Sequence, residues 1–192
     1  MRKLELSDLW PLPEYEKVRE DFRRRMIELK KRRRVQVGPL LSFIFENRDT
    51  VLFQVQEMLR AEDITEPERA QEELDIYNTL LPEEGELSAT LFIEVTDPDR
   101  LPDEMARLRG LDETVFLEIA GDHVPAVFEE GRATAEALST VQYVRFRLSP
   151  AQAQTFRAEK GSVVLAVYHP NYRDRSIFPP ETRQALGEDL GD

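Results

Sequence analysis

The chain has 192 residues, of which 41% are hydrophobic and 33% charged, and its formal net charge is −12. This composition is typical of globular proteins and excludes a fibrous chain or one disordered throughout. Because cysteine is absent, disulfides, thiolate metal ligands and thiol nucleophiles are excluded as well.

Neither a membrane span nor a secretory signal is predicted. A span needs about 20 consecutive apolar residues, and charged residues interrupt every window of that length. Residues 1–10 lack the apolar segment of a signal peptide. We therefore expect a cytoplasmic protein that does not enter membranes.

The first predicted element is an amphipathic helix over residues 14–32, with Pro13 in its first turn. Acidic residues lie in its first half and cations in its second half, which complements the helix dipole. Its apolar residues recur every three or four positions and form one stripe: Tyr15, Val18, Phe22, Met26 and Leu29.

Two further helices are predicted beyond a strand. Alternating apolar residues over 35–45 predict one strand with an irregularity at Gly38-Pro39, followed by a turn at 46–49. Residues 50–62 fit either period, and a helix is favoured because Asp49 or Thr50 can cap it. A Thr-x-x-Glu capping box at 65–68 predicts a helix over 66–80.

The remaining elements predict an α+β fold with a mixed, largely antiparallel sheet flanked by helices, the basic amphipathic helix lying at the N-terminus. Strands are expected at 87–95, 115–119, 124–128, 141–148 and 163–168, the last being the final strand. Helices are expected at 99–108, from the Ser149-Pro150 cap to about 161, and after Pro179-Pro180, with a polar loop at 129–137. One domain is expected, with a helical segment (1–34), a core (35–169) and a tail carrying a short helix (170–192).

Charge is strongly polarised along the sequence. Residues 17–34 carry ten of the 26 basic residues and a net charge of +7, whereas residues 62–86 carry ten acids and one base, Arg69. The cations are expected to be solvated or paired within the molecule, where the acidic segment could face them, or else to bind an acidic protein or nucleic acid. The candidate partner-binding residues are Arg23, Arg24, Lys30, Lys31, Arg32, Arg33 and Arg34.

Polar side chains gather on the second and third predicted helices: Gln54, Gln56, Glu57, Arg60, Glu72, Glu73, Asp75, Tyr77 and Asn78. Carboxylates on paired helices can bind metal or act as acid and base. The candidate catalytic set is Glu57, Arg60, Glu72, Glu73, Tyr77 and Asn78, with Gln56 beside them. A di-iron site needs Glu-x-x-His motifs, which are missing, so no metal or cofactor is predicted.

Outside that cluster, His123 and His169 are weak candidates for a metal ligand or base, with Asp122 beside the first, and Asn171 or Asp174 near the second. Phosphate-loop, dinucleotide and nucleophile-elbow motifs are absent. Whether the protein is an enzyme therefore stays open. Aromatic and apolar residues near the two ends either pack the termini or anchor a partner: Trp10, Tyr172, Ile177 and Phe178.

Five blocks carry a family resemblance: KKRRR at 30–34, FENR at 45–48, QVQEMLR at 54–60, EELDIYN at 72–78 and HPNY at 169–172. They resemble an uncharacterised bacterial family, domain of unknown function 3501, over nearly the whole chain. Members of that family are often encoded beside a rubrerythrin-like protein and an iron-sulfur oxidoreductase. The resemblance therefore implies a redox or peroxide-defence context.

Three functions follow as hypotheses. The first is a cytoplasmic accessory or binding protein that docks an iron-sulfur oxidoreductase or rubrerythrin-type partner by charge complementarity. The second is a metal-dependent or acid-base enzyme centred on the polar cluster. The third is a nucleic-acid-binding protein that uses the basic segment. Homo-oligomerisation stays open.

Overall fold

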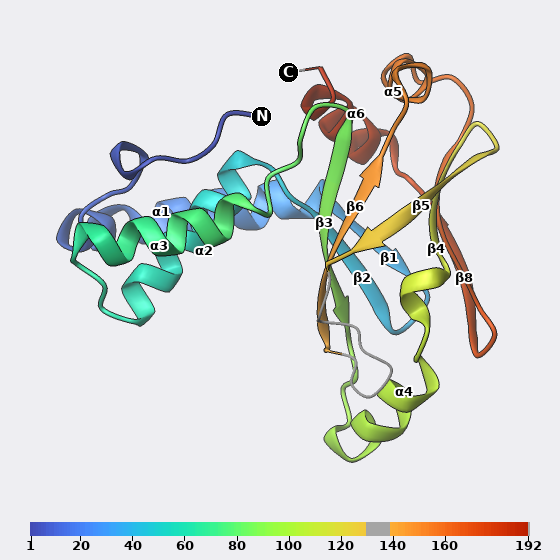
Figure 1. Cartoon of the computed structure of the whole chain (residues 1–192), viewed down its shortest axis with the longest axis horizontal. Helices are drawn as coiled ribbons and strands as arrows, with labels where there is room; N and C mark the ends of the chain where they lie inside the picture. The colour runs from blue at the N-terminus through green and yellow to red at the C-terminus, as the bar shows by residue number, and fades with distance from the viewer. Residues whose placement is uncertain (130–138, 192) are drawn as a thin grey trace.

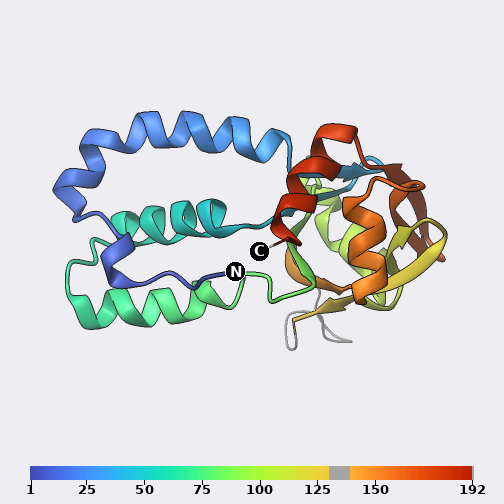
Figure 2. The ribbon, with the colours of Figure 1, turned by 90° about the horizontal axis from the view of Figure 1, so that it is seen from above.

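A barrel and a helical arm make up the computed structural model, which describes residues 1–129 and 139–191 (Figure 1). The strands are β1 (Arg34–Val37), β2 (Leu41–Phe45), β3 (Glu86–Ile93), β4 (Val115–Ile119), β5 (Asp122–Phe128), β6 (Val141–Arg147), β7 (Val163–His169) and β8 (Tyr172–Ile177). The helices are α1 (Leu12–Lys31), α2 (Arg48–Ala61), α3 (Pro67–Asn78), α4 (Leu101–Arg107), α5 (Pro150–Arg157) and α6 (Pro180–Asp189). Short 3-10 helices are η1 (Leu6–Asp8), η2 (Pro98–Arg100) and η3 (Leu111–Glu113). The arm consists of η1 and α1–α3, which project from the barrel (Figure 2).

One antiparallel sheet forms the barrel, with strand order β1-β2-β3-β6-β5-β4-β7-β8. The sheet curls until its edge strands approach each other. There the Tyr172 hydroxyl donates to the Val37 carbonyl at 2.6 Å and accepts from the Leu40 amide at 3.1 Å. The barrel is therefore nearly closed, and the expected α+β class with a largely antiparallel sheet is confirmed.

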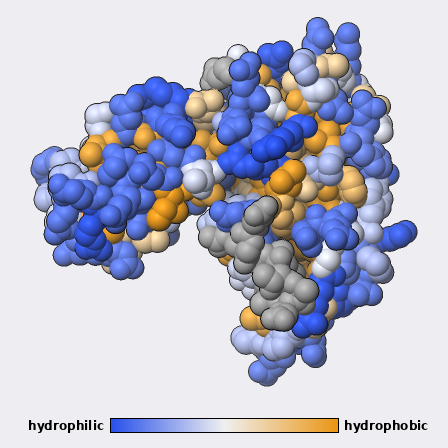
Figure 3. Space-filling view, in the orientation of Figure 1, coloured by the Kyte–Doolittle hydropathy of each residue, from blue (hydrophilic) through white to orange (hydrophobic). Residues whose placement is uncertain are grey.

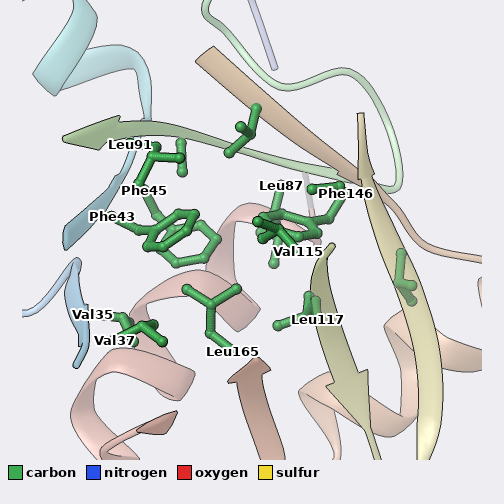
Figure 4. Packing of buried hydrophobic residues seen from close by; sticks show 14 of the residues in the cluster. Val35, Val37, Phe43, Phe45, Leu87, Leu91, Val115, Leu117, Phe146 and Leu165 are labelled. Atoms are coloured by element: carbon green, nitrogen blue, oxygen red, sulfur yellow. The ribbon is translucent and has the colours of Figure 1, made fainter. Parts of the chain in front are cut away.

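Each lobe has its own apolar core. Inward-facing side chains fill the barrel, including Val35, Val37, Phe43, Phe45, Leu87, Leu91, Val115, Leu117, Phe146 and Leu165 (Figure 4). A second cluster holds the arm, including Tyr15, Phe22, Met26, Val51, Val55, Leu59 and Leu74. Burial of each large apolar side chain contributes about 1.5–3 kcal/mol. The centre of the barrel is thus a packed core.

Two expectations about strands are wrong. Residues 35–45 form the β1–β2 hairpin instead of one strand, because Gly38 adopts a φ of 63° and reverses the chain. β8 was missed because three consecutive charged residues, Arg173, Asp174 and Arg175, occupy this edge strand and leave no apolar alternation to mark it. The last strand is therefore β8, and the segment after residue 169 closes the barrel instead of forming a tail.

Helix starts differ from expectation at two places. Asn47 caps α2, its side chain accepting from the Thr50 amide at 3.0 Å, so neither Asp49 nor Thr50 is the cap. At α3 the cap is Glu66, without a side-chain cap bond, and Pro67 begins the helix. The capping box expected at 65–68 therefore does not form.

Other elements match the sequence closely. Ser149 caps α5 in a capping box with Gln152, as expected from the Ser-Pro start. β4 and β5 form the expected hairpin, and Gly121 in its turn has a φ of 96°. The polar loop expected at 129–137 lies almost entirely outside the described residues. α6 packs against α5, where the Arg183 guanidinium donates to the Phe156 carbonyl at 3.0 Å.

Candidate functional site

Helix α1 is amphipathic but close to neutral. It carries seven cations and five carboxylates, a net charge of +2. Surface ion pairs join Lys17 to Glu14 at 2.7 Å and Lys31 to Glu28 at 2.7 Å, and Arg24 pairs with Asp21. The expectation of a strongly basic helix is therefore not confirmed, because neighbouring carboxylates offset most of its charge.

The basic run at 30–34 divides at the end of α1. Arg33 is 2% exposed and points into the junction of arm and barrel, where its guanidinium donates to the Phe45 carbonyl at 2.8 Å and the Glu46 carbonyl at 3.1 Å and pairs with Asp189. Arg34 lies in β1 and pairs with Glu94 at 3.3 Å. Arg33 is thus a structural residue, and its assignment to an exposed docking surface is corrected.

The acidic segment does not face the basic one. Helix α2 lies between α1 and α3 (Figure 2), and no ion pair joins residues 17–34 to residues 62–86 within the described chain. Glu86 instead pairs with Arg145 at 2.6 Å and Arg147 at 2.7 Å. The expected neutralisation of one segment by the other is wrong, since they occupy opposite sides of the arm.

A groove of about 650 Å³ lies between the second half of α1, the start of α2 and Trp10. Its apolar lining is Trp10, Phe22, Met26, Leu29 and Leu52, and its charged lining is Arg24, Arg25, Glu28, Arg32 and Asp49. Arg25 lies over the Phe22 ring at 5.5 Å, and nearby Lys30 lies over the Phe53 ring at 5.4 Å. Within the described residues, no carboxylate pairs with Arg25, Lys30 or Arg32, so this face of α1 keeps a positive charge.

The predicted polar cluster does not converge on one pocket. Gln56 binds both backbone groups of Trp10 at 3.0 Å, and Asn78 binds both backbone groups of Leu4 at 2.8 and 2.9 Å. Arg60 pairs with Glu16 at 2.5 Å. The Gln54 amide donates a hydrogen bond to the Glu46 carboxylate. On α3, Tyr77 and Glu73 are half-buried, whereas Glu72 and Asp75 are exposed. Gln56 and Asn78 thus fasten the N-terminal segment, Glu73 and Tyr77 line a separate pocket at the end of α3, and the predicted set is not brought together in one place.

Glu57 belongs to a polar group between α1 and α2. Its carboxylate accepts from Tyr15 at 2.7 Å and from Arg19 at 2.8 Å through each oxygen. The Arg19 guanidinium lowers the pKa of Glu57 below its usual range, against the opposing effect of burial. Burial, and then the bond to Glu57, raise the pKa of Tyr15. Glu57 is therefore an ionised residue that links α2 to α1 through hydrogen bonds.

The two histidines have structural contacts. His169 is buried, with Nε2 2.8 Å from the Arg109 carbonyl and Nδ1 accepting from the Asn171 amide at 3.2 Å. His123 is exposed and stacks on Tyr168, with Nε2 3.5 Å from Glu118. The described residues contain no group of three or more His, Asp or Glu side chains that could hold a metal ion.

The aromatic residues near the two ends pack inside the protein. Trp10 contacts the Tyr15 and Phe22 rings at centroid distances of 6.3 and 5.3 Å. Tyr172 and Phe178 are buried in the barrel, and only Ile177 of this set is strongly exposed, at 69%. The packing role expected for these residues therefore accounts for three of the four.

Comparison with known proteins places the whole chain in one family. Residues 3–190 match DUF3501, described as a protein of unknown function. The chain belongs to this family. The resemblance noted in the sequence is thereby confirmed.

A crystal structure of a novel protein of unknown function from Burkholderia pseudomallei K96243 is similar to this DUF3501 protein. The two are 34% identical with a TM-score of 0.93, over 98% of this chain and 100% of the other. No curated protein matches the chain. In the part that the structure describes, no helix is long and apolar enough to cross a membrane.

One residue of this DUF3501 protein had no signal in the sequence. Glu46 follows β2 and is only 4% exposed. Its carboxylate accepts from the hydroxyls of Thr50 and Thr90 and from the Gln54 amide. It also lines a pocket where the arm meets the barrel. A carboxylate beside a turn reads as solvent-exposed in sequence, and only contacts across 44 residues of chain reveal its burial.

Proposed function

We propose that this DUF3501 protein is a cytoplasmic accessory protein whose arm binds an acidic protein partner. The observation that carries the proposal is that Arg25 and Arg32 line an apolar groove at the end of α1 and, like nearby Lys30, have no carboxylate partner among the described residues. The rest of the molecule is acidic, with a net charge of −12 for the whole chain. A local positive face on an acidic protein favours one orientation of an acidic partner.

The groove supplies the second requirement of an interface, which is apolar area. Trp and Arg side chains often contribute most of the binding energy at an interface, especially near its desolvated centre. Here Trp10, Phe22 and Leu52 line the centre, while Arg25 and Arg32 lie at the charged part. Apolar contacts are expected to give affinity, and the arginines orientation and association rate.

The finer proposal is that the partner is an iron-sulfur oxidoreductase or a rubrerythrin-type protein. It rests on the genomic context implied by the family. Because the chain has no cysteine, it offers no thiolate ligands for an electron-transfer cluster. We propose that it binds or regulates such a partner and does not itself carry electrons through such a cluster.

The test begins with affinity purification of the tagged protein from its own host, with nuclease treatment and mass-spectrometric identification of bound proteins. Affinity for a recovered partner is then measured for the wild type and for the Arg25→Glu/Arg32→Glu variant at about 50 and 200 mM salt. We expect the variant to lose at least about tenfold in affinity, roughly 1.4 kcal/mol. Its affinity should also depend less on salt.

Arg69→Glu is the matched control, because it reverses an exposed charge on α3, on the other side of the arm. It should leave affinity unchanged. Equal affinities for wild type and the double variant would overturn the proposed surface. Tight, salt-sensitive binding of single- or double-stranded DNA in place of any protein would favour the nucleic-acid hypothesis instead. Recovery of the tagged protein without any partner would count against the proposal.

A further inference from the structure

A small pocket lies where the arm joins the barrel, at the end of α3 and over strands β3, β6 and β5. Its volume is about 180 Å³, and the side chains of Leu80, Val127 and Tyr143 give it an apolar lining, whereas Ala89, Phe128 and Val144 border it from strand positions whose side chains enter the barrel core. Figure 3 shows hydrophobic surface at this junction, beside the notch between the two lobes. A cavity of about 150 Å³ accommodates a benzene molecule. The pocket therefore suits a ligand with one ring or a group of similar size.

Glu46 gives this pocket a buried carboxylate that has no cationic partner among the described residues. The carboxylate is buried, and its three donors are neutral: the Thr50 hydroxyl, the Thr90 hydroxyl at 2.6 Å and the Gln54 amide at 3.0 Å. Among the described residues, no Lys, Arg or His pairs with it. Burial of an ionised group without an opposite charge costs several kcal/mol, so buried charges are normally paired.

The other buried glutamates follow that rule. Glu86 pairs with two arginines, Glu104 with Arg100 and Arg107, and Glu118 with Arg175 at 2.8 Å. Among the buried glutamates of the described chain, Glu46 is the one without a cation and the one that borders this pocket; the exposed Glu129 is a second carboxylate in the pocket wall. A positive charge supplied by a ligand would complete the same pattern.

An aromatic ring adds to the attraction for a cation. Tyr143 lines the pocket, and the face of such a ring attracts ammonium groups. Among the described residues, Arg145 is the one cation in the wall, and its guanidinium is already bound to Glu86 and to the carbonyls of Thr79 and Leu81. Its charge is therefore offset within the protein.

We propose that this pocket binds a small organic amine, with its ammonium group against Glu46 and its apolar part between Leu80, Val127 and Tyr143. The site is separate from the α1–α2 groove and does not depend on the proposed partner. Recognition rests on one buried carboxylate, an aromatic face and a volume that admits about one ring.

The experiment compares three ligands of nearly equal size: benzylamine, neutral benzyl alcohol and anionic benzoate. Binding to the full-length protein is followed by two-dimensional NMR titration. We expect benzylamine to shift the amides of Thr79, Ser88 and Val127, which surround the pocket. Benzyl alcohol should bind at least about tenfold more weakly, and benzoate should not bind.

Glu46→Gln keeps the shape of the side chain and removes its charge, and should weaken benzylamine at least tenfold. Glu118→Gln is the matched control, because that buried carboxylate lies on another face of the barrel and has its own arginine; it should leave affinity unchanged. The proposal is overturned if benzylamine causes no shifts at millimolar concentration, if shifts map elsewhere, or if benzyl alcohol binds equally well. Unchanged affinity in Glu46→Gln would also overturn it, and the wild-type comparison decides the matter if that variant does not fold.

Discussion

Arg33 and Arg32 are neighbours in sequence with opposite environments. Arg33 is buried at the junction of the lobes, while Arg32 is exposed. Replacing Arg33 with Met leaves the carbonyls of Phe45 and Glu46 without its donors. We predict that Arg33→Met lowers the free energy of unfolding by about 3–5 kcal/mol. Urea denaturation measures the change, and Arg32→Met should stay within about 0.5 kcal/mol.

The lowered pKa of Glu57 predicts that the stability of the protein depends on pH. Because Arg19 lowers its pKa in the folded protein, Glu57 binds protons more readily when unfolded. Its stabilisation is therefore fully present above the unfolded pKa, about 4.3, and is lost as pH falls through the lower folded pKa. We predict that Glu57→Gln is less stable than wild type by about 1–2 kcal/mol at pH 7, since the pair is partly exposed.

The difference between wild type and Glu57→Gln should shrink as pH falls from about 5 to 2. Denaturant midpoints across this range measure it. Glu14→Gln serves as the control, because Glu14 pairs with Lys17 on the surface. Its effect should be small at every pH. A constant difference between wild type and Glu57→Gln would contradict the assigned role of Arg19.

At the scale of elements, the β1–β2 turn decides whether the barrel closes. Gly38 has a φ of 63°, and a Cβ added there would collide with the Tyr172 hydroxyl and the Asp174 carboxylate. The same hydroxyl bridges Val37 and Leu40. We predict that Gly38→Ala costs about 2–4 kcal/mol of stability, from backbone strain plus this overlap.

The Gly110→Ala variant separates the effect of backbone strain from the effect of steric overlap. Gly110 also has a positive φ, 85°, but a Cβ there would meet nothing within 4 Å. Its substitution should cost only about 1–2 kcal/mol, the backbone term alone. Thermal or urea unfolding compares the variants. Equal losses at both positions would mean that the contact with Tyr172 contributes little.

Elements with a strong local signal were predicted well. The apolar stripe of α1, the Ser149 cap of α5 and the hairpin at Gly121 each follow from residues within a few positions. β8 had no such signal, because its stability comes from pairing with β7 and from contacts across the barrel opening. The positions of the polar candidates could not be predicted for the same reason. Gln56 and Asn78 bind backbone 46 and 74 residues away.

At the scale of the whole molecule, negative charge is in excess. The net charge is −12, and exposed carboxylates of α3 lie on the far side of the arm from α1. Self-repulsion at this charge destabilises the compact state. We predict that raising NaCl from about 10 to 150 mM, which shortens the Debye length from about 30 to 8 Å, raises the unfolding temperature by about 2–4 °C.

The Glu68→Lys/Glu72→Lys variant tests whether charge repulsion causes the rise in unfolding temperature with salt. Each replacement removes one negative charge and adds one positive charge, so the net charge changes from −12 to −8. Differential scanning calorimetry should find a smaller rise with salt in this variant. A fall in the unfolding temperature of the wild type with salt would mean that favourable ion pairs outweigh repulsion.

The sequence by itself determined the α+β class, the amphipathic α1, the absence of thiol chemistry and the polarised charge, because these depend on composition and short-range periodicity. Tertiary structure decided the closure of the barrel, the burial of Arg33 and the separation of the acidic and basic segments by α2. It also decided that Glu46 is buried beside a pocket and has no cationic partner among the described residues. Charge counts along a chain carry no direction in space, and only packing of residues far apart in sequence assigns each charge its partner.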